Sequence, residues 1–254
     1  MAEKLKLYGF NNLTKALSFN IYDVNYAKTV AEQKEYMDYI DAQYNSERLT
    51  RILTDLTDMI GARVLNIAKQ DYEPRGASAA LLIGENALEE QGGSVQLGHL
   101  DKSHVTVHTY PEYHPETSIA TFRVDIDVAT CGEITPLSTL DYLISSFESD
   151  IIVMDYRVRG FTRDVNGKKL FLDHEIHSIR DFISDDILRR YDAEDQNLYD
   201  MNLFHTRMLI KELDLQNYMF KENVDQLPLQ TRQEILQSLH REMEEIYCGK
   251  NIYG

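Results

Sequence analysis

Side chains that can transfer protons or act as nucleophiles are concentrated between residues 99 and 116. Four of the eight histidines lie in this stretch together with four other polar residues, and the set is His99, His104, His108, His114, Asp101, Ser103, Glu112 and Glu116. Histidine transfers protons near neutral pH, and a serine hydroxyl becomes an effective nucleophile when a base or a strained geometry assists it. The stretch is therefore either a site of chemistry or a solvated polar strand with its loops.

Metal binding is a second interpretation of these histidines. His104 and His108 are four residues apart, so on a strand they face the same side, as paired ligands would. No spacing of the H-E-x-x-H type accompanies them. His174 and His177, in the run DHEIH, also lack that spacing and are expected on a solvated helix face. We therefore predict no metal-ligand set.

Three short motifs carry a resemblance to a known family. They are Lys102-Ser103-His104, the run HTYPE from His108 to Glu112, and Thr130-Cys131-Gly132. With flanking segments such as LKLYGFNNLTKALSF, LNIAKQDYEPRGAS, LDYLISSFESDI and DYRVRGFTRDVNG, the chain resembles the bacterial S-adenosylmethionine decarboxylase proenzymes of the longer, enterobacterial-type branch. The resemblance runs nearly the length of the chain, so it is far more specific than an isolated pattern.

The resemblance implies that the chain makes its own cofactor by breaking its backbone between Lys102 and Ser103. The Ser103 hydroxyl attacks the Lys102 carbonyl to form an ester, and elimination then leaves a dehydroalanine that hydrolyses to a pyruvoyl group and ammonia. A single domain, residues 1–254, is thereby divided into a β chain of residues 1–102 and an α chain of residues 103–254. His108 is the implied proton-transfer residue of this processing. Positions 103 and 108 differ by an odd number, so a regular strand would point them to opposite faces. We therefore expect Ser103 on a bend or bulge, or action across a turn.

The pyruvoyl group formed from Ser103 is the implied catalytic cofactor. Its carbonyl forms a Schiff base with the substrate amine and accepts electrons as carbon dioxide leaves. Cys131 is the implied proton donor to the substrate carbon, and Glu112 is the implied acceptor of hydrogen bonds from the ribose hydroxyls. The cationic sulfonium favours aromatic faces, but sixteen tyrosines and nine phenylalanines offer too many candidates to select one. Cys248 has no motif support and is assigned no role.

The resemblance implies an enzyme, a pyruvoyl-dependent carboxy-lyase that converts S-adenosylmethionine to S-adenosylmethioninamine, the aminopropyl donor of spermidine and polyamine biosynthesis. The alternative is a pyruvoyl-dependent decarboxylase of ornithine or arginine, which would keep Ser103 and His108 but change the pocket; Glu112 and Cys131 argue against it. A non-enzymatic regulatory homologue would be expected to lack the processing residues, and a histidine-rich metalloenzyme is a more distant interpretation. The resemblance also implies magnesium as an activator, without a recognisable ligand motif, and a hetero-oligomer of four α and four β chains.

The surrounding elements follow from hydrophobic periodicity. Apolar residues at helical spacing predict a helix over 46–60, and alternation predicts half-buried strands over 103–112 and 117–130. Other expected elements are strands at 62–70, 77–84 and 150–161, a helix after Pro136, and helices from about residue 175 onward, including 203–213 and 232–247. A helix packed on antiparallel strands indicates an α+β fold. The resemblance implies, more specifically, an αββα sandwich of two antiparallel sheets with outer helices and a helical C-terminal extension.

Composition excludes several other classes of protein. The 42 acidic and 26 basic residues give a net charge of −16, which disfavours nucleic acids and anionic membranes as partners. No run of 18 apolar residues occurs, so we expect no transmembrane helix, and the first residues lack the apolar core of a signal peptide. Cys131 and Cys248 form no disulfide framework. We therefore expect a reduced, cytoplasmic protein.

Overall fold

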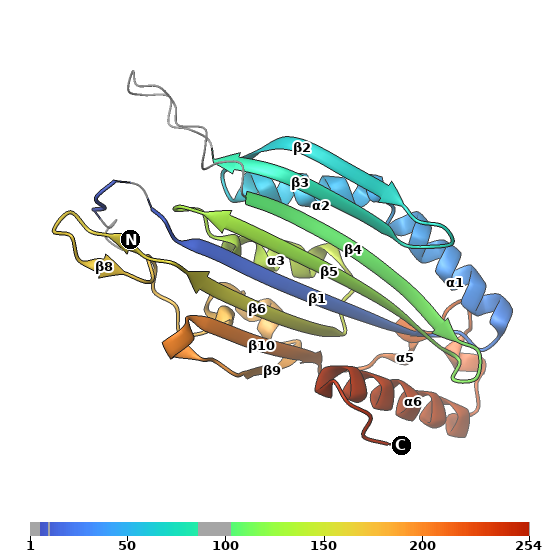
Figure 1. The fold of residues 1–254 in the computed structure, drawn as a ribbon. Coiled ribbons are helices and arrows are strands. Elements are labelled where there is room, and N and C mark those ends of the chain that lie inside the picture. Colours follow the sequence, from blue (N-terminus) through green and yellow to red (C-terminus); the bar gives the residue numbers. More distant parts are fainter. Residues whose placement is uncertain (1–5, 10, 86–102, 254) are drawn as a thin grey trace.

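A large antiparallel sheet dominates the fold (Figure 1). The structure is a computed structural model that describes residues 6–9, 11–85 and 103–253. The sheet has eight strands in the order β2-β3-β4-β5-β1-β6-β10-β9. Their bounds are β1 Thr14–Tyr26, β2 Ala62–Asp71, β3 Ala77–Glu85, β4 Ser103–His114, β5 Ile119–Cys131, β6 Ile151–Arg159, β9 Tyr191–Asp195 and β10 Leu203–Ile210. A separate ribbon pairs β7 (Thr162–Arg163) with β8 (Lys169–Leu170).

The α-helices of the described residues connect or flank these strands. They are α1 Val30–Gln43, α2 Ser46–Met59, α3 Leu140–Ser146, α4 Asp185–Leu188, α5 Leu215–Tyr218 and α6 Leu229–Cys248. Side chains define the starts of the first two, because Thr29 forms a capping box with Glu32 and Asn45 accepts a hydrogen bond from a backbone amide of α2. In α2, Leu49, Leu53 and Leu56 recur at helical spacing and are all buried. That apolar stripe holds the helix against the sheet.

One face of the sheet packs against α1, α2 and α3, and this layer contains the main core (Figure 1). Alternation along the strands supplies the apolar side chains, since successive residues point to opposite faces. In β1 the buried residues Leu17, Phe19 and Ile21 lie on this face, and Val105 and Val107 of β4 continue it. We call it the helix-covered face.

The opposite face, which we call the second face, is covered only at one end within the described part of the chain. There α6 packs Ile235, Leu239 and Met243 against Val24 and Ile151 in a smaller apolar cluster. Elsewhere the second face carries polar side chains that are exposed or half-buried, among them Ser18, Asp125, Asp127, Asp155 and His108. Burial by helices is thus asymmetric between the two faces.

The α+β class, with antiparallel strands and outer helices, is confirmed. The expectation that one chain forms two stacked sheets is corrected. The described residues of the chain form one eight-stranded sheet and a two-stranded ribbon. The physical reason is that β2, β3, β9 and β10 extend the same sheet sideways instead of pairing in a second layer.

The strands of the central motifs are also confirmed, whereas β1, α1, β9 and β10 differ from expectation: α1 was not anticipated, and β9 lies in the region expected to be helical. Residues 203–210 form β10 rather than a helix, because Phe204, Thr206 and Met208 alternate into the interior. The central strand β1 was not anticipated, since its exposed face is polar and Lys15 interrupts the apolar alternation. The helix over 232–247 is confirmed as part of α6.

No helix among the described residues is both long enough and apolar enough to cross a bilayer. The division into residues 1–102 and 103–254 remains a prediction, because Lys102 and the segment before it lie outside the described residues.

Candidate active site

Ser103 is the first residue of β4 and is only 4% exposed. It pairs with Ile83 of β3, and its parity with Val105 places it on the helix-covered face. His104 pairs with Ala129, so the antiparallel register brings Ser103 beside Thr130 of β5. The neighbouring Lys102 falls outside the described residues, so the bond predicted to break has no described geometry.

Cys131 ends β5, directly after the residue that lies beside Ser103. It is a free, half-buried thiol and pairs with Thr14 at the start of β1. The strand stops there because Gly132 adopts a φ of 77°, a left-handed conformation that glycine enters without steric cost. The structure therefore brings the two predicted residues Ser103 and Cys131 to the same end of two adjacent strands. Strand parity assigns their side chains to opposite faces at that end.

His108 lies on the second face of β4, away from Ser103. Five residues of extended chain separate the two by about 16 Å. The pairing of β4 is regular from 103 to 108 with β3 and from 104 to 108 with β5, so within the described residues, from Ser103 onward, the expected bend or bulge is not found. The Nδ1 of His108 lies 3.4 Å from the Tyr72 hydroxyl, and the imidazole stacks on the Tyr110 ring at a centroid distance of 6.4 Å. Within one chain, His108 and Ser103 are therefore not in contact.

Glu112 lies still farther along β4, about 30 Å from Ser103 at the usual strand rise. It is exposed and lines a cavity of about 310 Å³ between the second face and α6. Tyr22 and Tyr110 also line this cavity, and the hydroxyl of buried Thr121 has no hydrogen-bond partner there. Across the cavity, burial raises the pKa of the Glu242 carboxyl, and the negative charge of Glu112 raises it further.

The aromatic rings of this cavity already have a cationic neighbour. The guanidinium carbon of Arg123 lies 5.1 Å from the Tyr110 ring centroid and 6.0 Å from that of Tyr22. Arg123 also donates to both carboxylate oxygens of Asp125, with a distance of 2.7 Å from Nε to Oδ1. A cationic substrate group would have to compete with this guanidinium for the same two rings.

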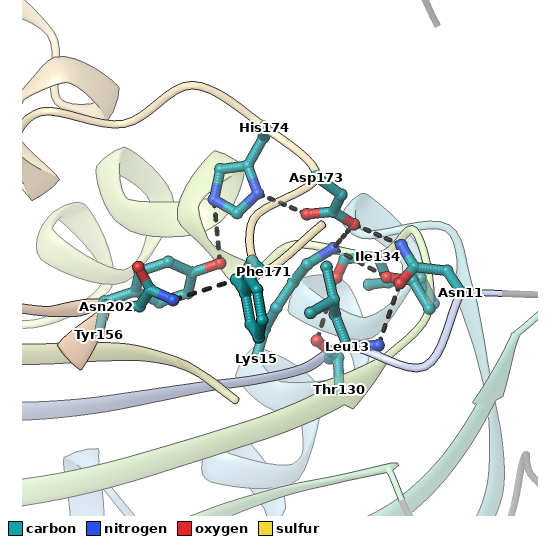
Figure 2. A network of polar contacts seen from close by, with 11 residues as sticks. Asn11, Leu13, Lys15, Thr130, Ile134, Tyr156, Phe171, Asp173, His174 and Asn202 are labelled. Atoms are coloured by element: carbon teal, nitrogen blue, oxygen red, sulfur yellow. Dashed lines mark hydrogen bonds and ion pairs between the residues drawn. The ribbon is translucent and has the colours of Figure 1, made fainter. Parts of the chain in front are cut away.

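A buried polar network lies behind the turn that follows Cys131 (Figure 2). Lys15 donates from Nζ to the Gly132 carbonyl at 2.8 Å and to Oδ2 of Asp173 at 2.7 Å. Burial alone would raise the pKa of Asp173, but hydrogen bonds from its three partners and the charge of Lys15 lower it to about 2. The Asp173 carboxyl is therefore ionised at neutral pH. Sequence reasoning missed its pair with Lys15, although Lys15 falls on the apolar parity of β1.

The predicted absence of a metal site can be compared with the described residues only. Nowhere among them do three or more His, Cys, Asp or Glu side chains form a group that could hold a metal ion. His174 contacts Asp173 and the Tyr156 hydroxyl, and His177 contacts Glu175. Contrary to expectation, the DHEIH run is not helical, and His174 is part of the buried network.

Comparison with known proteins identifies the family. The family described as S-adenosylmethionine decarboxylase matches residues 35–160. The chain is 62% identical to the S-adenosylmethionine decarboxylase proenzyme of Clostridium beijerinckii, over 100% of this chain and 99% of that protein. It is 63% identical to the proenzyme of the same name from Clostridium botulinum strain Eklund 17B, over 100% and 98% of the two chains.

A solved structure, the adenosylmethionine decarboxylase of Aquifex aeolicus VF5, is 16% identical to this chain with a TM-score of 0.35, and the match covers 66% of this chain and 99% of that one. The ornithine or arginine alternative gains no support from these comparisons. The resemblance drawn from the motifs is confirmed: the chain belongs to the S-adenosylmethionine decarboxylase family, a family of proenzymes that form their pyruvoyl group from a serine by self-cleavage.

Proposed function

We propose that this chain cleaves itself between Lys102 and Ser103 and then decarboxylates S-adenosylmethionine. The observation that carries the proposal is the register of β4 and β5, in which Ser103 begins one strand beside the end of the other, next to Cys131. A new amino-terminal residue at position 103 would thus be formed within reach of a thiol. When formed, a pyruvoyl group at this position supplies an electrophilic carbonyl that holds the substrate amine and withdraws electrons as carbon dioxide leaves.

Ser103 is the nucleophile of the processing step. Its hydroxyl is shielded from water, which favours attack on the preceding carbonyl over competing hydrolysis. After cleavage residue 103 is a chain end, so its carbonyl is free to turn toward the second face, where strand parity places the Cys131 side chain.

Cys131 holds the proton that is delivered to the substrate carbon. A thiol proton can be transferred to a strongly basic carbanion by general acid catalysis. Cys131 is half-buried, and strand parity places its side chain on the second face. That face is also rich in carboxylates, among them Asp125, Asp127 and Asp155, which attract the positive charge of a sulfonium substrate.

His108 and Glu112 serve the site of a second copy of the chain. His108 lies about 16 Å along the strand from Ser103, and Glu112 lies about 30 Å from it. These distances are too long for a single substrate molecule to contact all three residues of one chain. Both lie on the second face, which in the described residues is covered by α6 at one end only. Two copies stacked on this face through a two-fold axis would bring His108 and Glu112 of each chain toward the end of β4 that begins with Ser103 in the other. The layers would then be helix, sheet, sheet and helix, the order of the expected sandwich.

We also propose an assembly, a location and a metal dependence for this chain. The αβ units associate further into the hetero-oligomer of four α and four β chains. Both cysteines are free thiols, which suits a reducing cytoplasm. Magnesium acts as an activator, and the described residues offer no ligand group to which we assign it.

The decisive experiment combines a denaturing gel, intact mass and carbon dioxide release. The purified protein should contain chains of residues 1–102 and 103–254, the second with a blocked amino terminus that reacts with hydroxylamine. It should release carbon dioxide from S-adenosylmethionine and from neither ornithine nor arginine. The Ser103→Ala variant should remain uncut and inactive. An active, uncut wild-type chain would overturn the processing, and release from ornithine or arginine alone would overturn the substrate.

A further inference from the structure

Lys15 is a charged side chain in an apolar layer. It lies on the helix-covered face of β1, in line with Leu17 and Phe19, and is 1% exposed. Burying an ammonium group costs free energy that a single ion pair barely compensates, and an apolar residue of similar volume is often at least as stabilising. Stability is therefore a weak reason for a lysine at this position, and its contacts suggest a different one.

The contacts of Lys15 hold the ammonium in one direction. Asp173 accepts from Nζ at 2.7 Å and is itself fixed by Nδ1 of His174 at 2.7 Å and by the side-chain amide of Asn11 (Figure 2). Behind His174, the Tyr156 hydroxyl lies 3.2 Å from Nε2. The network therefore orients the ammonium that also contacts Gly132.

The other contact of Lys15 reaches the turn that carries Cys131. The Gly132 amide donates to the Leu13 carbonyl at 3.2 Å, and the Gly132 carbonyl accepts from Lys15 at 2.8 Å. Thr130, on the other side of Cys131, donates from its hydroxyl to the Ile134 carbonyl at 3.1 Å. Cys131 is thus the single residue between two anchored neighbours.

We propose that Lys15 is a positioning residue: held by Asp173, it fixes the Gly132 peptide and thereby the direction of the Cys131 thiol. The inference rests on the proposed function, because it requires Cys131 to be the proton donor. Proton transfer is sensitive to placement, and a displacement of about 1 Å can lower a rate by about 10²-fold. Asp173 and His174 follow β8, so the segment after β6 is tied to the end of β5 through this one ammonium.

The test compares Lys15→Met with Tyr218→Phe as a matched control. The control removes another buried hydrogen bond of 2.7 Å, from Tyr218 to Asp150, near the start of β6 and remote from Cys131. Because Lys15→Met leaves the buried Asp173 carboxylate without its ammonium partner, the double variant Lys15→Met/Asp173→Asn, which also removes that negative charge, is made as well. Self-cleavage, kcat, KM and the iodoacetamide alkylation rates of Cys131 and Cys248 are measured for each protein, with Cys248 as the internal reference.

We expect the Lys15 variants to cleave, to lose about 10- to 100-fold in kcat and to keep KM within about threefold. The alkylation rate of Cys131 relative to Cys248 should change at least about threefold, as a reoriented thiol requires. Tyr218→Phe should change neither kcat nor this ratio.

Folded Lys15 variants with wild-type kcat and an unchanged alkylation ratio would overturn the proposal, and so would chains that remain uncut, since Lys15 would then act in processing. Alkylation in a Ser103→Ala background needs no activity, so it separates this inference from the proposed function. One outcome is that the alkylation ratio of Cys131 to Cys248 changes in the Ser103→Ala background while Cys131→Ala keeps full activity. In that case the proposed function fails, although Lys15 still orients the Cys131 thiol.

Discussion

Asp23 and Asp150 form a buried carboxyl pair in which the negative charge of Asp150 opposes ionisation of Asp23. Tyr36 donates to Asp23 at 2.8 Å, and Tyr218 donates to Asp150 at 2.7 Å. Burial is the largest cause of the raised pKa of both groups, and for Asp150 the pKa reaches about 6. Both carboxyls lie toward the end of β1 that is farthest from Lys15, so their titration should leave the network at Cys131 intact.

The first prediction is a loss of stability as the pH rises. The pKa of Asp150 in the folded protein is above its unfolded value of about 3.9. The contribution of its protonation to the free energy of unfolding is therefore fully present below about pH 4 and is lost as the pH passes 6. We expect the wild-type protein to lose on the order of 2 kcal/mol relative to Asp150→Asn between pH 4.5 and 7.5. Urea unfolding of both proteins across this range measures the difference. If the difference in free energy of unfolding between the two proteins stayed constant with pH, Asp150 would have an unshifted pKa.

The second prediction separates the formation of the cofactor from its use. Cys131→Ala should cleave, because the thiol is not the nucleophile of processing, and should lose kcat by about 10²- to 10⁴-fold, as expected when a general acid is removed. Cys248→Ala is the matched control and should retain full activity. Gel analysis and carbon dioxide release measure the two steps separately. Full turnover by Cys131→Ala would mean that another group donates the proton.

The third prediction concerns the chain in which His108 acts. Ser103→Ala and His108→Ala should each remain uncut when expressed alone. Co-expressed with different tags, they should form mixed assemblies in which the His108→Ala chain is cut, since the partner supplies the histidine. The control pairs His108→Ala with a Ser103→Ala/His108→Ala double variant, which has no histidine to supply. If the His108→Ala chain is never cut in the mixed assembly, His108 acts within its own chain.

The fourth prediction concerns substrate affinity. Glu112→Gln should cleave normally but show a KM for S-adenosylmethionine that is about 10- to 100-fold higher, because a hydrogen bond to a charged acceptor contributes about 1.5–3 kcal/mol. Part of this loss should shrink at high salt, because neutralising the carboxylate also removes attraction for the sulfonium. Glu116→Gln, in the turn beyond β4, is the matched control. Equal KM values for both variants would remove Glu112 from the substrate site.

Much of the sheet could be predicted because a half-buried antiparallel strand alternates apolar residues, which face the core, with polar residues, which face the solvent. Residues 103–112 and 117–130 show this alternation clearly, and both form strands. β10 was misread because Leu203, Phe204 and Met208 fit a helical spacing as well as an alternating one. Periodicity alone could not decide between the two elements.

Some residues of the candidate site could be predicted from the sequence, and others could not. Ser103 and Cys131 could be selected from motifs, and the antiparallel register then places them at one end of the sheet. The contact of Lys15 with Asp173 could not be derived, since 158 residues separate the two and no local pattern pairs them. The only local signal was a lysine with the parity of Leu17, and its meaning depends on the tertiary fold.

The strand order has a consequence for the two products of self-cleavage. Strands β1, β2 and β3 would belong to one product, and the remaining strands to the other. Yet β1 is inserted between β5 and β6, and β3 stays paired with β4. The fragments are therefore interlocked, and scission removes a covalent link without releasing either piece. Refolding of the mature protein then becomes a bimolecular reaction that slows on dilution, whereas uncut Ser103→Ala can recover as a single chain.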